Sequence, residues 1–185
     1  MQASLLGAEQ RRIGVSIAVP PPYAEELVAA RRATGDPLAD AIPAHITILG
    51  PTVIDADNLD RVYEHVHAAC RAVEPFDVHL RGSATFRPIS PVVFIQVVQG
   101  IAECEELERR VRSGLLDQHL RFNYHPHVTI AHEVDDDALD AAFEKMAFYE
   151  ATFPVTEIHV FEHGDDDVWR PVRAFALGVE ENANE

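Results

Sequence analysis

The sequence predicts an α+β fold in which two mainly antiparallel sheets, flanked by helices, form two lobes with a central cleft between them. Apolar runs of strand type are interspersed with amphipathic helical segments along the 185 residues. The same order of segments occurs twice, and a His-x-Thr phrase stands at the same place in each copy. We therefore expect one bilobal domain over residues 1–185, built from repeat-like units at about 13–86 and 92–179.

The first half of the chain is predicted to run strand, helix, strand, helix, strand. Pro20-Pro21-Pro22 separates the first strand from a helix whose first turn carries Glu25 and Glu26, where the helix dipole favours acidic side chains. The motif strand that follows should end at Gly50-Pro51. The expected ranges are 13–19, 23–33, 44–49, 55–73 and 76–81.

The second half repeats this order and adds one strand. Its first strand is an almost uninterrupted apolar run, which predicts burial on both faces. Outside the two phrases the halves share little identity, so the duplication is inferred from element order and the phrases alone. The expected ranges are 92–98, 101–115, 124–132, 136–148, 153–162 and 169–179.

Net charge and the distribution of apolar residues limit the kinds of molecule that the protein can bind. The formal charge is −16, from 15 Lys and Arg against 31 Asp and Glu, which opposes binding to long nucleic acid. If nucleic acid is the substrate, we therefore expect recognition of one RNA end or one small nucleotide. No apolar run approaches the roughly 20 residues of a membrane span, and Met1–Gln10 lacks the pattern of a secretory signal. We expect a cytoplasmic monomer without a membrane partner, in which Cys70 and Cys104 are buried free thiols.

Two short phrases carry the candidate chemistry. His45-Ile46-Thr47-Ile48 and His127-Val128-Thr129-Ile130 both space a histidine and a threonine by two residues. On a strand that spacing sends both polar side chains to one face. If the two strands face each other, the four side chains form a ring of two imidazoles and two hydroxyls.

Such a ring suits phosphodiester cleavage, which needs a base for the incoming oxygen and an acid for the leaving one. Histidine can serve in both roles because its unperturbed pKa lies at about 6.5. Threonine hydroxyls can donate hydrogen bonds to phosphoryl oxygens. We therefore predict His45 and His127 as the catalytic pair and Thr47 and Thr129 as the phosphate-binding residues, with no cofactor and no metal.

The two phrases resemble the signature tetrapeptides of the two-histidine (2H) phosphoesterase superfamily, which includes the bacterial 2'-5' RNA ligase-like proteins and the cyclic nucleotide phosphodiesterases. The resemblance spans nearly the whole chain, since the duplicated bilobal fold of that family matches the predicted element order. It implies metal-independent opening of 2',3'-cyclic phosphates, or the making and breaking of 2'-5' linkages. Several relatives place an arginine shortly after the second motif, where this chain has His132. Strand alternation predicts that His132 faces away from His127.

Two other functions stay open at this point. His125-x-His127 has the strand spacing of a metal-binding pair, although no third ligand follows it locally. A non-catalytic protein that binds a nucleotide or an RNA end would retain the same pocket. Substrate contacts are expected from the loops around the cleft: Tyr124 and Phe86 to stack a base, Arg87 or Arg121 to hold a second phosphate, and His125 to touch substrate or orient a neighbour.

Overall fold

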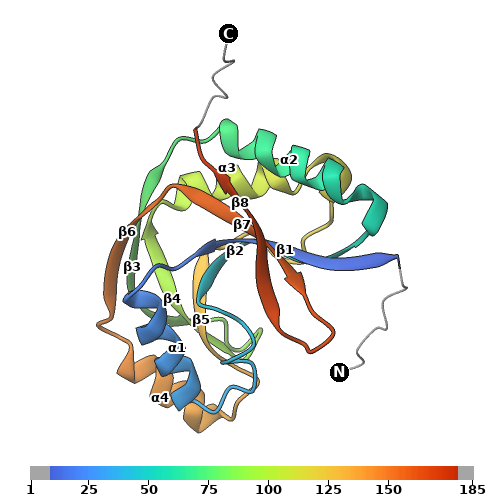
Figure 1. Cartoon of the computed structure of the whole chain (residues 1–185). Coiled ribbons are helices and arrows are strands. Elements are labelled where there is room, and N and C mark those ends of the chain that lie inside the picture. Colours follow the sequence, from blue (N-terminus) through green and yellow to red (C-terminus); the bar gives the residue numbers. More distant parts are fainter. Residues whose placement is uncertain (1–8, 179–185) are drawn as a thin grey trace.

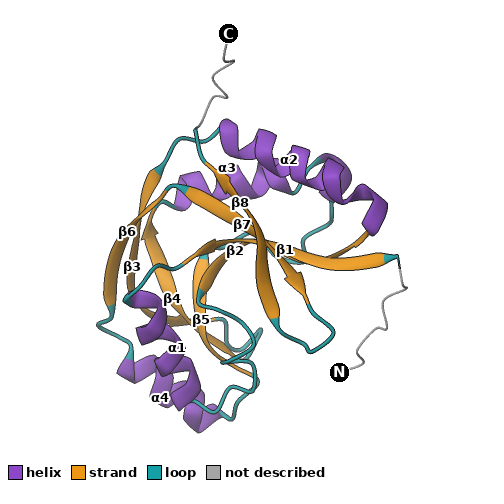
Figure 2. Cartoon of the chain, in the orientation of Figure 1, coloured by secondary structure: helices purple, strands orange, loops and turns teal. Residues whose placement is uncertain are grey.

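The computed structural model describes residues 9–178, which form eight strands and four α-helices (Figures 1 and 2). Two short 3₁₀ turns, Ala56–Asn58 and Gly114–Leu116, precede α2 and follow α3. Most of Met1–Gln10, the segment that lacks the pattern of a secretory signal, lies outside these residues. The strands are β1 (Gln10–Ala18), β2 (His45–Asp55), β3 (Phe76–Thr85), β4 (Val92–Gln99), β5 (His127–His132), β6 (Glu150–Val155), β7 (Glu157–His163) and β8 (Trp169–Ala176). The helices are α1 (Tyr23–Ala33), α2 (Leu59–Arg71), α3 (Ile101–Val111) and α4 (Asp136–Lys145).

The strands form two four-stranded sheets in which every recorded pairing is antiparallel, as the sequence predicts. Sheet A has the order β2-β1-β7-β8 and sheet B the order β5-β4-β3-β6. The two sheets are not the two sequence units: β3 follows the first motif strand in sequence yet pairs in sheet B, and β7 and β8 return to sheet A. Each sheet therefore contains strands from both halves of the chain.

The helices are exchanged in the same way. Helix α1, from the first half, packs against β5 of sheet B, and α3, from the second half, packs against β2 of sheet A. Figure 1 shows α2 beside α3 on one side of the molecule and α1 beside α4 on the other. Each motif strand is thus supported by the helix that precedes the other motif strand.

Several predicted boundaries are wrong. Strand β2 does not end at Gly50-Pro51 but continues to Asp55, because residues 52–55 still pair with β1. The single strand expected over 153–162 is two strands that belong to different sheets, with Thr156 between them. Helix α4 ends at Lys145 and α3 at Val111, three or four residues short of expectation. Among the helices, α1 is predicted to the residue.

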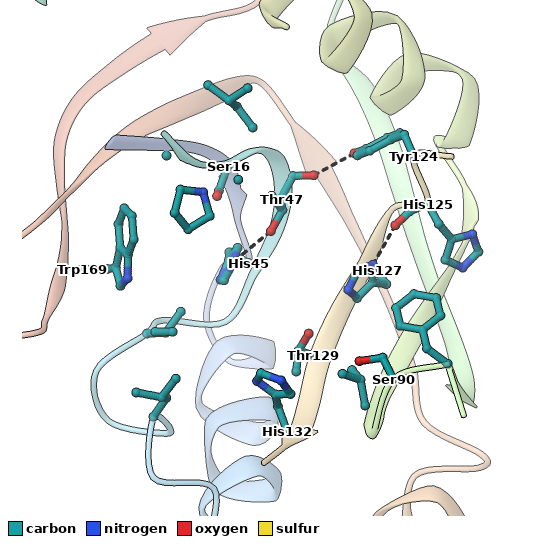
Figure 3. Close-up of a pocket in the computed structure, with 18 of the residues that line it drawn as sticks. Ser16, His45, Thr47, Ser90, Tyr124, His125, His127, Thr129, His132 and Trp169 are labelled. Carbon is teal, nitrogen blue, oxygen red and sulfur yellow. Dashed lines mark hydrogen bonds between the residues drawn. The ribbon is translucent and has the colours of Figure 1, made fainter. Parts of the chain in front are cut away.

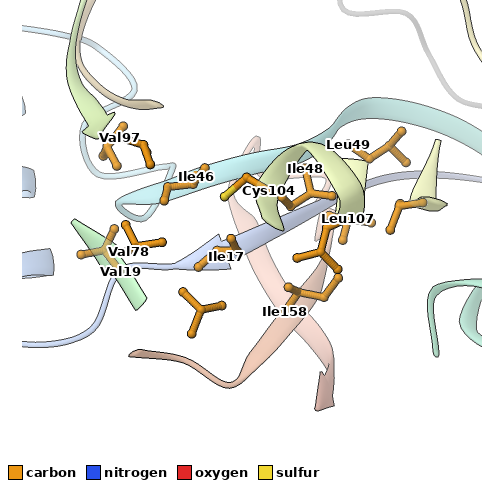
Figure 4. Packing of buried hydrophobic residues seen from close by; sticks show 14 of the residues in the cluster. Ile17, Val19, Ile46, Ile48, Leu49, Val78, Val97, Cys104, Leu107 and Ile158 are labelled. Carbon is orange, nitrogen blue, oxygen red and sulfur yellow. The ribbon is translucent and has the colours of Figure 1, made fainter. Parts of the chain in front are cut away.

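The core lies on the face of each motif strand that turns away from the histidines. Ile46 and Ile48 of β2 are buried beneath Cys104 and Leu107 of α3 (Figure 4). Cys70 and Cys104 are free and fully buried, as expected. Alternation along β2 therefore separates an apolar face, which fixes the strand, from a polar face, which is left for the cleft.

Candidate active site

The two motif strands are the neighbouring edges of the two sheets. Strand β2 ends the order of sheet A, β5 ends the order of sheet B, and the two strands lie in contact without pairing. His45 and Thr47 of β2, together with His127 and Thr129 of β5, line one cavity of about 800 Å³. Figure 3 shows the four side chains pointing into the space between the strands. The structure thus brings together the four residues that the motifs single out.

Both histidines are held by the same local hydrogen bond. Nδ1 of His45 lies 2.7 Å from the carbonyl oxygen of Pro43, and Nδ1 of His127 lies 2.7 Å from that of His125. A carbonyl only accepts, so each Nδ1 carries the hydrogen and each neutral ring presents an unprotonated Nε2. The motif therefore fixes the tautomer as well as the position of each imidazole.

The two Nε2 atoms differ in their surroundings. Nε2 of His45 lies 3.1 Å from Oγ1 of Thr47, whose hydroxyl donates to the neutral ring. Within residues 9–178, Nε2 of His127 has no hydrogen-bond partner and remains open to the cavity.

Burial favours the neutral form of both rings. Loss of solvation lowers the pKa of His127 to about 4, although the hydrogen bond to the His125 carbonyl acts in the opposite direction. Loss of solvation likewise lowers the pKa of His45, and the positive charge of Arg31 adds to that effect. In the unliganded cleft both histidines are poised to accept a proton.

The prediction that His132 faces away from His127 is wrong, because His132 lines the same cavity (Figure 3). The reason is a β-bulge. Thr129 pairs with Phe94 and Ala131 pairs with Val93, which leaves one extra residue, Ile130, on β5. The extra residue shifts the alternation by one, so that a side chain five positions after His127 returns to the cleft face.

Strand β2 has a β-bulge at the equivalent position. Thr47 pairs with Ser16 and Leu49 pairs with Val15, so Ile48 is the extra residue. The burial of residues 45–50 follows the same order as that of residues 127–132, half-buried, buried, half-buried, buried, buried, half-buried. Gly50 therefore occupies on β2 the position that His132 occupies on β5, and it too lines the cavity.

Three of the residues expected around the cleft do line it. The hydroxyl of Tyr124 donates to the carbonyl oxygen of Thr47 at 2.9 Å, which ties the approach to β5 to the opposite motif strand. The ring of Phe86 meets that of His127 edge-on, with centroids 5.0 Å apart. His125 orients His127 through its backbone carbonyl and presents its own ring to the cavity.

The two expected arginines lie outside the cavity lining. Arg87 makes ion pairs with Asp140 at 2.5 Å and Asp136 at 3.6 Å, both on α4. Arg121 lies over the ring of Phe122, 5.1 Å from its centroid. The role expected for them, holding a second phosphate, stays a prediction.

Sequence reasoning missed Arg31, Ser16, Ser90 and Trp169, which also line the cavity. Trp169 stands beyond His45 on the flank away from His127, and Ser90 stands on the opposite flank (Figure 3). Arg31 carried a detectable signal, since it follows the buried Leu27 by four residues and so falls on the inward face of α1. Ser90 precedes β4 and Trp169 begins β8, whereas Ser16 lies inside β1 and pairs with Thr47.

Within residues 9–178, no group of three or more His, Cys, Asp or Glu side chains has the arrangement of a metal site. In the same residues, no helix is both long enough and apolar enough to cross a membrane.

Curated proteins resemble most of the chain. A Bacillus cereus protein named "Putative phosphoesterase" is 26% identical over 151 residues, covering 80% of this chain and 86% of the relative. A protein from Bacillus licheniformis with the same description is 23% identical over 146 residues, covering 78% of this chain and 86% of the relative.

Solved structures share the fold. E. coli LigT complexed with NADP+ superimposes with a TM-score of 0.68 at 20% identity, covering 92% of this chain and all of LigT. Its complex with 3'-AMP gives a TM-score of 0.68 at 18% identity, covering 91% and 99% of the two chains. The sequence profile of the 2'-5' RNA ligase superfamily matches residues 19–167. The chain, with its two His-x-Thr strands at one cleft in a LigT-like fold, belongs to the 2'-5' RNA ligase superfamily.

Proposed function

We propose that the protein is a metal-independent phosphoesterase that hydrolyses 2',3'-cyclic phosphate or 2'-5' phosphodiester bonds of RNA ends or small nucleotides. One observation carries the proposal: two histidines, each fixed in the same tautomer by a backbone carbonyl, face one cleft from two neighbouring strand edges. Each has a threonine two residues later on the same face. This arrangement supplies a proton acceptor and a proton donor on two sides of a bound phosphate.

In the proposed reaction, the neutral histidine takes a proton from water as the water oxygen bonds to phosphorus. The other histidine, protonated at Nε2, gives its proton to the leaving oxygen as the phosphorus–oxygen bond breaks. The hydroxyls of Thr47 and Thr129 donate to the non-bridging oxygens. The pair ends with its protons exchanged, and solvent restores the starting state.

The cleft is suited to a nucleotide. Its volume of about 800 Å³ is that of a small-molecule site, and apolar walls surround the polar centre. Phe161 and Trp169 lie on its lining, where an aromatic face can stack with a base. The structures of E. coli LigT with 3'-AMP, NADP+ and ATP lend support, because all three ligands are nucleotides.

Replacement of either histidine tests the acid and base roles. His45→Ala and His127→Ala should each lower the turnover of a 2',3'-cyclic nucleotide by roughly a hundred- to ten-thousandfold, because each removes one proton-transfer group. His119→Ala, an exposed histidine outside the cleft, should leave the rate unchanged. Full activity in either cleft variant would rule out its assigned role.

Chelation and binding separate this function from the two alternatives. Turnover should be unaffected by EDTA, whereas loss of activity that zinc restores would favour a metal-dependent hydrolase built on His125 and His127. Binding of 2',3'-cyclic nucleotides and 2'-5' oligonucleotides without any turnover would identify a non-catalytic nucleotide-binding protein instead.

A further inference from the structure

The cleft has a charge pattern opposite to that of the whole molecule. The formal charge of the chain is −16. Among the described residues that line the cleft, no carboxylate occurs and Arg31 is the one side chain with a permanent charge. Burial lowers the pKa of His45 and of His127 and so favours their neutral forms, and threonine hydroxyls carry no charge. Arg31 is therefore the group in the cleft that can offset the charge of an anion.

Arg31 is fixed at one end. Its Nε donates to Oδ2 of Asp36 at 2.8 Å, and the two side chains are only 7% and 1% exposed. The same carboxylate accepts from the backbone N–H of His132 at 3.1 Å and, through Oδ1, from that of Leu38 at 2.8 Å. Asp36 thereby connects α1, the loop after it and the end of β5, and it places Arg31 beside His132.

The two terminal nitrogens of the Arg31 guanidinium are available to a ligand in the cavity. Within residues 9–178, its two terminal nitrogens make no hydrogen bond, and neither is sealed from the cavity that the residue lines. Those nitrogens carry four of the five N–H groups of a guanidinium, in the planar fork that matches phosphate oxygens. Arg31 also lies close enough to His45 for its charge to act on that ring.

We propose that Arg31 binds the anionic phosphate group of the ligand through its two terminal nitrogens while Asp36 holds its Nε. This inference rests on the proposed function for the identity of the ligand, a phosphate ester, but not for the binding itself. The guanidinium draws the phosphate toward His45, and the anion compensates for burying the cation. The acidic surface elsewhere favours a ligand small enough to enter the cleft.

Titration with inorganic phosphate tests the inference without turnover. Arg31→Met should weaken phosphate binding, measured by calorimetry, by about 10- to 100-fold, the usual effect of losing charge-assisted hydrogen bonds. Arg32→Met is the matched control. It removes the next arginine of α1, which pairs with Asp40 on the exposed surface, and should leave phosphate affinity unchanged.

A purely structural role for Arg31 predicts a different result. Arg31→Met alone strands the Asp36 carboxylate in the interior, which can unfold the protein or displace His132. The double variant Arg31→Met with Asp36→Asn removes both charges and relieves that strain. If Arg31 binds phosphate, the double variant should fold and still bind phosphate about 10- to 100-fold more weakly. Native affinity in the double variant would overturn the inference.

A measurement on the unaltered protein covers the case in which these variants do not fold. Addition of inorganic phosphate should shift the guanidinium ¹⁵N resonances of Arg31 and leave those of Arg32 in place. Unshifted Arg31 resonances at saturating phosphate would overturn the inference.

Failure of the proposed function gives a separate result. A protein that binds phosphate through Arg31 but turns over no cyclic or 2'-5' substrate would retain the inference and lose the activity. Turnover with the same KM in wild type and Arg31→Met would retain the activity and lose the inference.

Discussion

At the scale of single residues, each histidine of the motif is oriented by one hydrogen bond from its ring to the backbone carbonyl two residues earlier. The carbonyls of Pro43 and His125 select the tautomer in which Nε2 faces the cleft. The motif supplies the histidine and threonine, and the residue two positions earlier supplies the orienting carbonyl.

The pH dependence of kcat/KM follows from the lowered histidine pKa values. The productive form carries one proton on the pair, so activity should peak between the two pKa values. Because both lie below the ordinary value of 6.5, we expect the optimum below pH 6.5. Above it both rings are neutral and no acid remains, and far below it both are protonated and no base remains. Rates of 2',3'-cyclic nucleotide hydrolysis between about pH 4 and about pH 9 check this, and a rate still rising above neutrality would contradict it.

At the scale of elements, a strand bulge and a supporting helix define the cleft face of each motif strand. The bulges at Ile48 and Ile130 bring Gly50 and His132 to equivalent places. Below β2, helix α3 presses Cys104 and Leu107 against the apolar face of the strand. The position of His45 and Thr47 therefore depends on how firmly α3 is seated.

The start of α3 offers a test of how closely that helix is seated on the chain beneath it. Gly100 has φ +87°, and a Cβ there would lie 2.8 Å from the carbonyl oxygen of Asp77. Gly100→Ala adds a clash to left-handed strain, so we expect it to lower the free energy of unfolding by more than about 2 kcal/mol. Gly35→Ala, at φ +77° with nothing within 4 Å of the added carbon, should lose only about 1–2 kcal/mol. Urea unfolding measures both, and equal losses would contradict the predicted clash.

At the scale of the whole molecule, the exchange of strands and helices between halves couples the two sheets. Sheet A is covered by a helix from the second half, and sheet B by one from the first. Across the cleft the hydroxyl of Tyr124 bonds to the backbone of Thr47. The spacing of the two motif strands is thus held by contacts that no single half contains.

Tyr124→Phe tests that coupling. Loss of the hydroxyl removes one hydrogen bond between the two sides of the cleft, so we expect a loss of about 0.5–1.5 kcal/mol in the free energy of unfolding together with a lower kcat. Tyr63→Phe, which removes a hydroxyl away from the cleft, is the control and should leave kcat unchanged. An unchanged kcat in Tyr124→Phe would show that this bond does not set the spacing.

Much of the fold and the centre of the site could be read from local pattern. The range of α1, the two-sheet class and the shared strand face of each His-x-Thr pair all follow from short-range periodicity and spacing. The orientation of His132 was not predicted, because strict alternation assigns it to the opposite face, and the adjacent apolar pair Ile130-Ala131 does not by itself indicate a bulge. The break at Thr156 was not predicted either, although the buried positions change there from Ala151, Phe153 and Val155 to Ile158 and Val160. A one-residue change of phase does not say which sheet each strand joins, and long-range pairing assigns the two strands to different sheets.

The sequence by itself determined that His45 shares a strand face with Thr47 and that His127 shares one with Thr129, because alternation and a spacing of two are local properties of the backbone. Only the tertiary structure decided what surrounds them. It brought β2 and β5 edge to edge, turned His132 inward and placed Arg31 of α1 in the same cavity as His45. Those placements depend on pairings and packing between residues distant in the chain, whose free energies no single segment contains.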